Sequence, residues 1–129
     1  IVTISDYHSR FWKAKYGGEN ISHIDLPIQT DDYHDLNFRK RQPVFLWSSQ
    51  AERGLHILAL VWREIREAIP DARLYITASH RLWGVNYDGN DWVRPTFEHE
   101  EGVTVLGAIQ REGLVALQRR ASIQMSSLT

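Results

Sequence analysis

Residues 43–76 constrain the fold of this chain more than any other part of its sequence. A short apolar run at 44–47 has the length of a buried strand, and a polar turn at 48–54 follows it. Apolar residues then recur at three- and four-residue steps, which is the spacing of one helix face: Leu55, Leu58, Ala59, Trp62, Ile65 and Ile69. A second apolar strand begins at Leu74. Strand, helix and strand in this order predict a βαβ crossover, which makes the two strands parallel.

The segments on either side continue this alternation. Towards the amino terminus we expect a strand at 1–4, a helix capped by Ser5 or Asp6, and an extended segment at 21–28. The helix is expected to turn three side chains inward, namely Phe11, Trp12 and Ala14.

Further along, the pattern predicts a long loop with a short helix at 79–95, a strand at 103–106 and a helix at 111–120. A last strand begins at Ser122. The whole order predicts an α/β fold, a Rossmann-like open parallel sheet with helices on both faces.

Composition excludes several classes of function. A formal net charge of −1 over 129 residues gives no reason to expect a nucleic acid or an anionic membrane as partner. The absence of cysteine excludes a disulfide framework and a thiolate metal site, and it is consistent with a cytoplasmic location. No apolar run reaches the length of a transmembrane segment. The six histidines show no metal-ligand spacing, so we expect no metal and no cofactor.

The turn at 48–54 is the strongest candidate for a binding site. Ligands of an open parallel sheet bind outside the carboxyl ends of its strands, and this turn follows such an end. Arg53 is expected in the first turn of the following helix, where its charge opposes the helix dipole but suits an anion. Ser48 and Ser49 add hydroxyl donors, and Gly54 lets a ligand approach the backbone. The standard dinucleotide and P-loop glycine signatures are absent.

Other interpretations of these residues remain open. Ser49 is also placed to cap the helix, with Glu52 three residues later as its capping-box partner and Arg53 as an ordinary surface side chain. His80 is a further site candidate, because it follows the strand that begins at Leu74. The alternative for His80 is a surface histidine in the loop.

Three parts of the chain carry a family resemblance. The first reads VFLWSSQAERGLHILALVWREIREAIPDARLYI at 44–76, with Arg53 and Gly54 before the helix and Pro-Asp-Ala-Arg-Leu at the entry to the second strand. The second reads GVTVLGAIQREGLVALQRRASIQMSSL at 102–128, and the third consists of residues 1–17 followed by 21–33. In order and spacing these parts resemble retaining GT-B glycosyltransferases, from the end of the amino-terminal domain into the nucleotide-sugar-binding domain. The resemblance covers nearly the whole chain.

The resemblance implies roles for individual residues. Arg53 matches the basic residue that holds the donor's diphosphate and stabilises charge on the leaving nucleotide. The segment after the strand at 103–106 matches the part that meets the nucleobase, which implies Gly107, Ala108 and Ile109. Many family members carry a further arginine shortly before the Arg-Gly pair, where this chain has Ser48 and Ser49. Its contacts with phosphate are therefore expected to differ from those of such family members.

The resemblance also implies the domain organisation and the partners. Residues 1–18 would end an amino-terminal domain or link to it, 19–42 would be a connector, and 43–129 would form an incomplete nucleotide-sugar-binding domain. The chain begins with Ile rather than Met, so we expect a piece of a longer protein, with the acceptor domain and the family's paired glutamates outside it. The expected reaction transfers a sugar from a nucleotide diphosphate donor to a hydroxyl of a glycan, lipid or protein acceptor. The full-length enzyme would be cytoplasmic or membrane-associated.

A non-catalytic α/β domain is the alternative to a transferase. It would be a receiver-like or sugar-binding module, or a scaffold that keeps the fold without a working site. A receiver-like module needs an acidic cluster at its strand ends, and Ser48 and Ser49 provide none.

Overall fold

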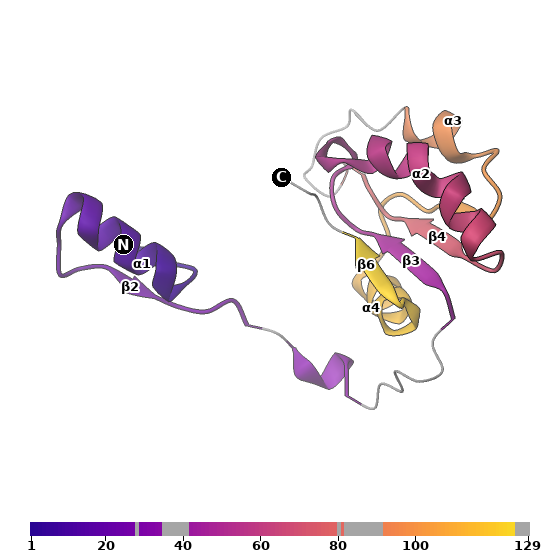
Figure 1. Cartoon of the computed structure of the whole chain (residues 1–129). Coiled ribbons are helices and arrows are strands. Elements are labelled where there is room, and N and C mark those ends of the chain that lie inside the picture. Colours follow the sequence, from indigo (N-terminus) through magenta and orange to yellow (C-terminus); the bar gives the residue numbers. More distant parts are fainter. Residues whose placement is uncertain (28, 35–41, 80, 82–91, 126–129) are drawn as a thin grey trace. The chain divides into compact units, whose positions relative to one another are not determined.

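The computed structural model of the chain divides into two compact units, Ile1–His34 and Asp35–Thr129 (Figure 1). No helix among the described residues is both long enough and apolar enough to cross a bilayer. The described residues are 1–27, 29–34, 42–79, 81 and 92–125.

The first unit is a small βαβ arrangement. Strands β1 (Val2–Thr3) and β2 (Ser22–His23) are parallel neighbours, and helix α1 (Asp6–Tyr16) lies between them in the chain. Ser5 caps α1, because its Oγ accepts a hydrogen bond from the backbone N–H of His8 at 3.2 Å. The predicted strand, cap and helix are therefore present, although each strand is only two residues long.

The inward face predicted for α1 is wrong. Three side chains expected inside are exposed: Phe11, Trp12 and Ala14. Of its own residues α1 buries Ser9 alone, because two strands of two residues offer the helix too little sheet to cover. Trp12 stacks on Tyr16 at the surface, with ring centroids 4.8 Å apart. A short 3-10 helix, η1 (Thr30–Asp32), lies in the predicted connector.

The second unit contains a four-stranded sheet in which every neighbouring pair of strands is parallel, in the order β5-β4-β3-β6. Along the chain the elements are β3 (Val44–Trp47), α2 (Leu55–Ala68), β4 (Arg73–Ile76), α3 (Val93–Phe97), β5 (Val103–Val105), α4 (Arg111–Arg120) and β6 (Ile123–Met125). The predicted crossover through α2 is confirmed, and α4 has its predicted bounds. The strand order proceeds outward from β3 in one direction and then reverses between β3 and β6. That order is compatible with half of a Rossmann-like doubly wound sheet.

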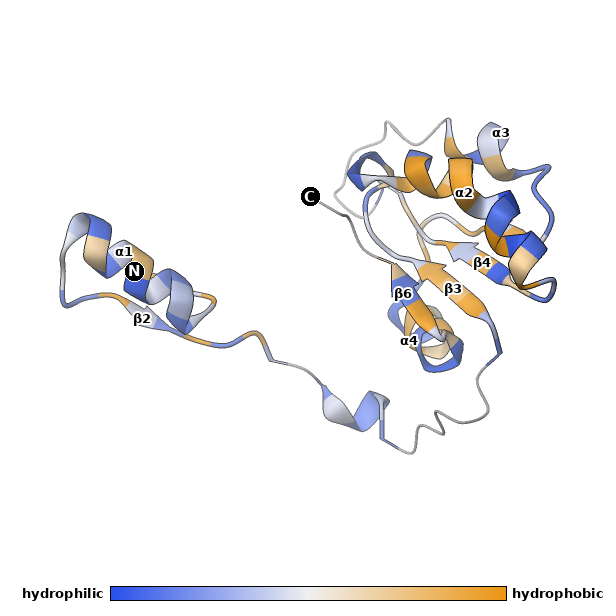
Figure 2. Cartoon of the chain, in the orientation of Figure 1, coloured by the Kyte–Doolittle hydropathy of each residue, from blue (hydrophilic) through white to orange (hydrophobic). Residues whose placement is uncertain are grey.

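The two faces of the sheet bury different cores. Phe45 and Trp47 of β3 belong to the core that α2 and α3 cover. Val44 and Leu46, which alternate with them, belong to the core that packs against α4. Figure 2 shows β3 hydrophobic over most of its length, as expected for a strand covered on both sides. The prediction of a parallel α/β sheet with helices on both faces is confirmed.

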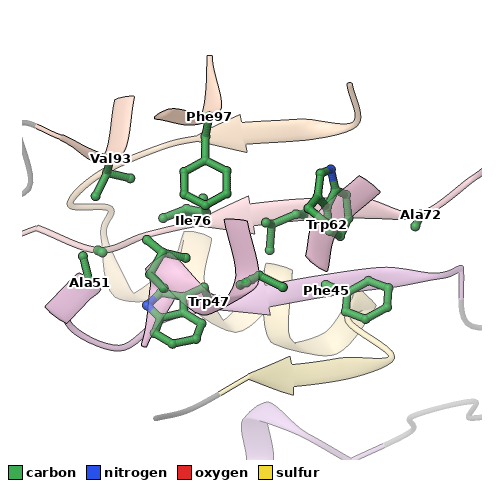
Figure 3. Packing of buried hydrophobic residues seen from close by; sticks show 12 residues of the cluster. Phe45, Trp47, Ala51, Trp62, Ala72, Ile76, Val93 and Phe97 are labelled. Carbon is green, nitrogen blue, oxygen red and sulfur yellow. The ribbon is translucent and has the colours of Figure 1, made fainter. Parts of the chain in front are cut away.

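The larger core is built around aromatic side chains. Figure 3 shows Phe97 of α3 pointing toward Ile76 of β4. Trp62 of α2 meets Phe45 of β3 edge to face, with ring centroids 5.7 Å apart. Ile69 was predicted to face inward, and this is wrong: it lies just past the end of α2 and is 40% exposed.

Helix α2 begins later than the sequence suggests. Residues Ala51–Arg53 form a separate 3-10 helix, η3, and Gly54 follows with a left-handed backbone at φ 111°. A side chain is strained in that conformation, so glycine permits the break, and α2 starts at Leu55. Arg53 therefore precedes the helix instead of lying in its first turn. The predicted cap at Ser49 is also wrong, because no side chain caps α2.

Trp62→Ala tests the larger core. This side chain is fully buried, and its indole N–H donates to the carbonyl of Glu101 at 3.0 Å. Truncation leaves a cavity and an unpaired carbonyl, so we expect the free energy of unfolding in urea to fall by about 3–5 kcal/mol. The control is Leu60→Ala on the same helix, where Leu60 is 78% exposed. This control should lose less than about 0.5 kcal/mol, and equal losses in the two variants would contradict the packing.

Gly54→Ala tests the break before α2. An alanine Cβ would sit at ordinary contact distance, 3.8 Å from the Trp47 ring, so the cost comes from the backbone conformation. We expect the free energy of unfolding to fall by about 1–2 kcal/mol, measured by urea denaturation. Gly113→Ala inside α4 is the matched control and should raise it by about 0.5–1 kcal/mol. A stabilising effect of Gly54→Ala would show that the left-handed turn is not required.

Candidate functional site

A cavity of about 430 Å³ opens at the carboxyl edge of the sheet, where β3 and β4 end. Its lining comes from the two segments that follow these strands: Ser48, Ser49, Gln50, Arg53, Thr77, Ala78 and Ser79. The strand order reverses on the other side of β3, between β3 and β6. Ligands of open parallel sheets bind outside the carboxyl ends of the strands, where this cavity lies.

Hydrogen bonds between the ends of β3 and β4 fix the lining of the cavity. The backbone carbonyl of Trp47 accepts from the backbone N–H of Thr77 at 2.9 Å and from its Oγ1 at 3.3 Å. The indole N–H of Trp47 donates to the carbonyl of Ser49 at 2.9 Å. Trp47 and Thr77 are both buried, so the turn after β3 is tied to the core by bonds shielded from water.

Two serine hydroxyls of the lining already accept hydrogen bonds from the protein. Nε2 of Gln124 donates to Ser48 Oγ at 3.2 Å. The backbone N–H of Arg81 donates to Ser79 Oγ, also at 3.2 Å. A hydroxyl has one hydrogen of its own, and in each serine the accepted bond excludes that hydrogen from the direction of the incoming donor, which leaves it able to donate elsewhere. The cavity therefore offers donors to a ligand, which suits an oxyanion.

Arg53 supplies the positive charge of the cavity. It is exposed, and among the described residues its guanidinium has no carboxylate partner. A guanidinium left without a carboxylate beside hydroxyl donors is able to hold a phosphate or another anion. Arg53 also borders an apolar hollow of about 180 Å³, whose other lining residues are Trp47, Gly54, Ile57, Leu58, Val61 and Met125.

The residues predicted to bind the diphosphate divide between these two hollows. Ser48, Ser49 and Arg53 line the polar cavity, whereas Gly54 lines the apolar hollow. His80, the further candidate from the sequence, lies outside the described residues.

The segment predicted to meet the nucleobase follows β5 at the same edge of the sheet. The backbone N–H of Gly107 lies 3.4 Å from the carbonyl of Ile76, the last residue of β4. Ile109 is half-buried and Ala108 is exposed. None of the three predicted residues lines the cavity, so the structure places them near its β4 side without joining them to it.

Sequence reasoning missed Thr77, Ser79 and Gln124. The first two had a signal, because polar residues follow the apolar strand β4 just as Ser48 and Ser49 follow β3. Gln124 had none, because the serine that it contacts lies 76 residues earlier in the chain.

A larger cavity, of about 640 Å³, lies at the opposite edge of the sheet, beside the last turns of α2. Arg63 pairs there with Glu100 at 3.3 Å, and Arg66 pairs with Glu101. Arg66 also donates to the carbonyl of Ala72 at 3.1 Å. The two guanidinium groups already have carboxylate or carbonyl partners within the protein. Their ion pairs connect α2 to the segment before β5. We therefore place the candidate site at the carboxyl edge.

No group of three or more histidine, aspartate or glutamate side chains within the described part of the chain is arranged to hold a metal ion. No protein-family model matches the chain, and no curated protein matches it.

Proposed function

We propose that the chain supplies the donor-binding half of a GT-B glycosyltransferase, which transfers a sugar from a nucleotide diphosphate to an acceptor hydroxyl. The observation that carries the proposal is the position of Arg53. Arg53 lines a cavity with hydroxyl-bearing residues at the carboxyl edge of a parallel sheet. This is the place and the chemistry that a diphosphate requires.

In this proposal Arg53 acts on the leaving group. When the glycosidic bond breaks, negative charge grows on the diphosphate, and a fixed cation nearby stabilises that charge. Ser48 and Ser49 take the place of a second cation by donating hydroxyl hydrogens to phosphate oxygens. The backbone and apolar side chain of the segment at 107–109, on the far side of β4, would meet the nucleobase.

A non-catalytic binding domain is the second candidate, and one observation favours it. The described lining of the cavity contains no carboxylate and no histidine, so it offers no general acid or base. In the transferase proposal such groups would come from outside these residues. The two candidates share the anion site and differ in whether sugar transfer occurs.

Titration with UDP, GDP and ADP tests the anion site and identifies the base. We expect at least one nucleotide to shift backbone amide resonances of residues 48–54 and 77–79 in the isotope-labelled chain. Arg53→Ala should weaken this binding by about tenfold to a hundredfold, because it removes a charge-assisted hydrogen bond. Arg73→Ala is the charge-matched control, since Arg73 borders a cavity at the amino end of β4. Unchanged amides, or equal losses in the two variants, would reject the site.

In the complete transferase, Arg53→Ala should lower kcat/KM by about tenfold to a hundredfold. Part of this loss should remain in single-turnover sugar transfer at saturating donor, where weaker binding no longer lowers the rate, because negative charge on the diphosphate grows as the bond breaks. A loss smaller than threefold would mean that the hydroxyls or the backbone carry the phosphate.

A further inference from the structure

We propose that Gln124 is a positioning residue, which turns the hydroxyl hydrogen of Ser48 away from itself and so favours the orientation that donates to a phosphate oxygen of the ligand. This inference deepens the proposed function, because it assumes an oxyanion in the cavity at the carboxyl edge. It assigns to strand β6 a part in ligand binding that the lining of the cavity does not reveal by itself, since Gln124 is not among the lining residues.

The sheet brings the two side chains together. In the parallel register Gln124 of β6 lies beside Leu46 of β3, so both residues project from the face that α4 covers. Ser48 follows Leu46 by two residues, which places it on the same face one step beyond the end of β3. The result is the contact between Gln124 Nε2 and Ser48 Oγ at 3.2 Å.

The direction of this hydrogen bond decides its effect. The amide N–H of Gln124 occupies a lone pair of Ser48 Oγ and therefore prevents the hydroxyl hydrogen from pointing at Gln124. With that bond the hydroxyl hydrogen has about two of its three staggered positions left, and without the bond it has all three. Ser79 has an equivalent constraint from the backbone N–H of Arg81. The side chain of Gln124 thus does for Ser48 what the backbone N–H of Arg81 does for Ser79. Unlike a backbone donor, the Gln124 amide is removable by mutation.

Two hydroxyls held as donors beside Arg53 define the class of ligand group that fits. Ionised phosphate oxygens accept hydrogen bonds and donate none, so they match both serines at once. A ligand group that donates, such as an amide or a sugar hydroxyl directed at Ser48, would lose this advantage. The arrangement favours the diphosphate part of a nucleotide over its nucleoside part.

A double-mutant cycle on UDP affinity tests the inference. Ser48→Ala should weaken binding about tenfold, because it removes a hydrogen bond to a charged group. Gln124→Met keeps the length of the side chain and releases the hydroxyl, so it should weaken binding about 1.5-fold, because the share of the donating position falls from about one in two to about one in three. In the Ser48→Ala background Gln124→Met should have no further effect. Additive losses would show that Gln124 acts through the fold and would overturn the proposal.

Gln124→Glu gives the opposite polarity at the same position. A carboxylate accepts the Ser48 hydrogen and brings a negative charge near the phosphate, so UDP affinity should fall by at least about tenfold. Gln42→Glu is the charge-matched control, because Gln42 is exposed and lies before β3 at the other edge of the sheet. Melting temperatures of all variants separate binding losses from unfolding. Equal losses in the two glutamate variants would contradict the inference.

Inorganic pyrophosphate separates this inference from the proposed function. If pyrophosphate binds with the Gln124 and Ser48 dependence described above while no nucleoside diphosphate binds, the positioning role stands and the donor site fails. If UDP binds the wild-type chain and Gln124→Met has no effect, the positioning role fails and the donor site stands. If neither ligand binds, both are rejected.

Discussion

The structure of the second unit depends above all on the parallel pairing of β3 with both β4 and β6. Parallel strands bring their carboxyl ends to one edge, so polar residues that follow separate strands meet there. Ser48 and Thr77 follow β3 and β4 in this way, and Gln124 lies in the neighbouring strand β6. Thr77 bonds to the carbonyl of Trp47 and Gln124 bonds to Ser48, so side-chain hydrogen bonds add to the pairing of the strands. The order of the strands therefore brings together the polar groups of this edge, and no single local motif contains them all.

The apolar pattern within each segment was enough to predict β3, α2 and β4, because the residues that each of them buries recur at the spacing of a strand or of a helix face. The same reasoning failed for α1. Its aromatic residues have a helical spacing, but the sheet beside them is too small to cover them. The size of the sheet that a helix packs on decides which of its residues become buried. The sequence of the helix alone does not reveal that size.

The candidate site was predictable in part. The rule that ligands bind at the carboxyl ends of parallel strands pointed to Ser48, Ser49 and Arg53, and these residues do line a cavity there. The expected helix start was wrong, because the apolar pattern does not reveal that Gly54 adopts a left-handed conformation. The contact of Gln124 depends on register between distant strands, which a single sequence does not specify.

The short helix η3 before Gly54 contains positions with different freedom to change. Within η3, Ala51 is fully buried, whereas Glu52 and Arg53 are exposed. Replacements at the exposed positions would leave the packing of α2 intact, so selection for folding would act weakly on them and strongly on Ala51. Descendants of this chain would be able to diverge in ligand preference while inheriting an unaltered scaffold.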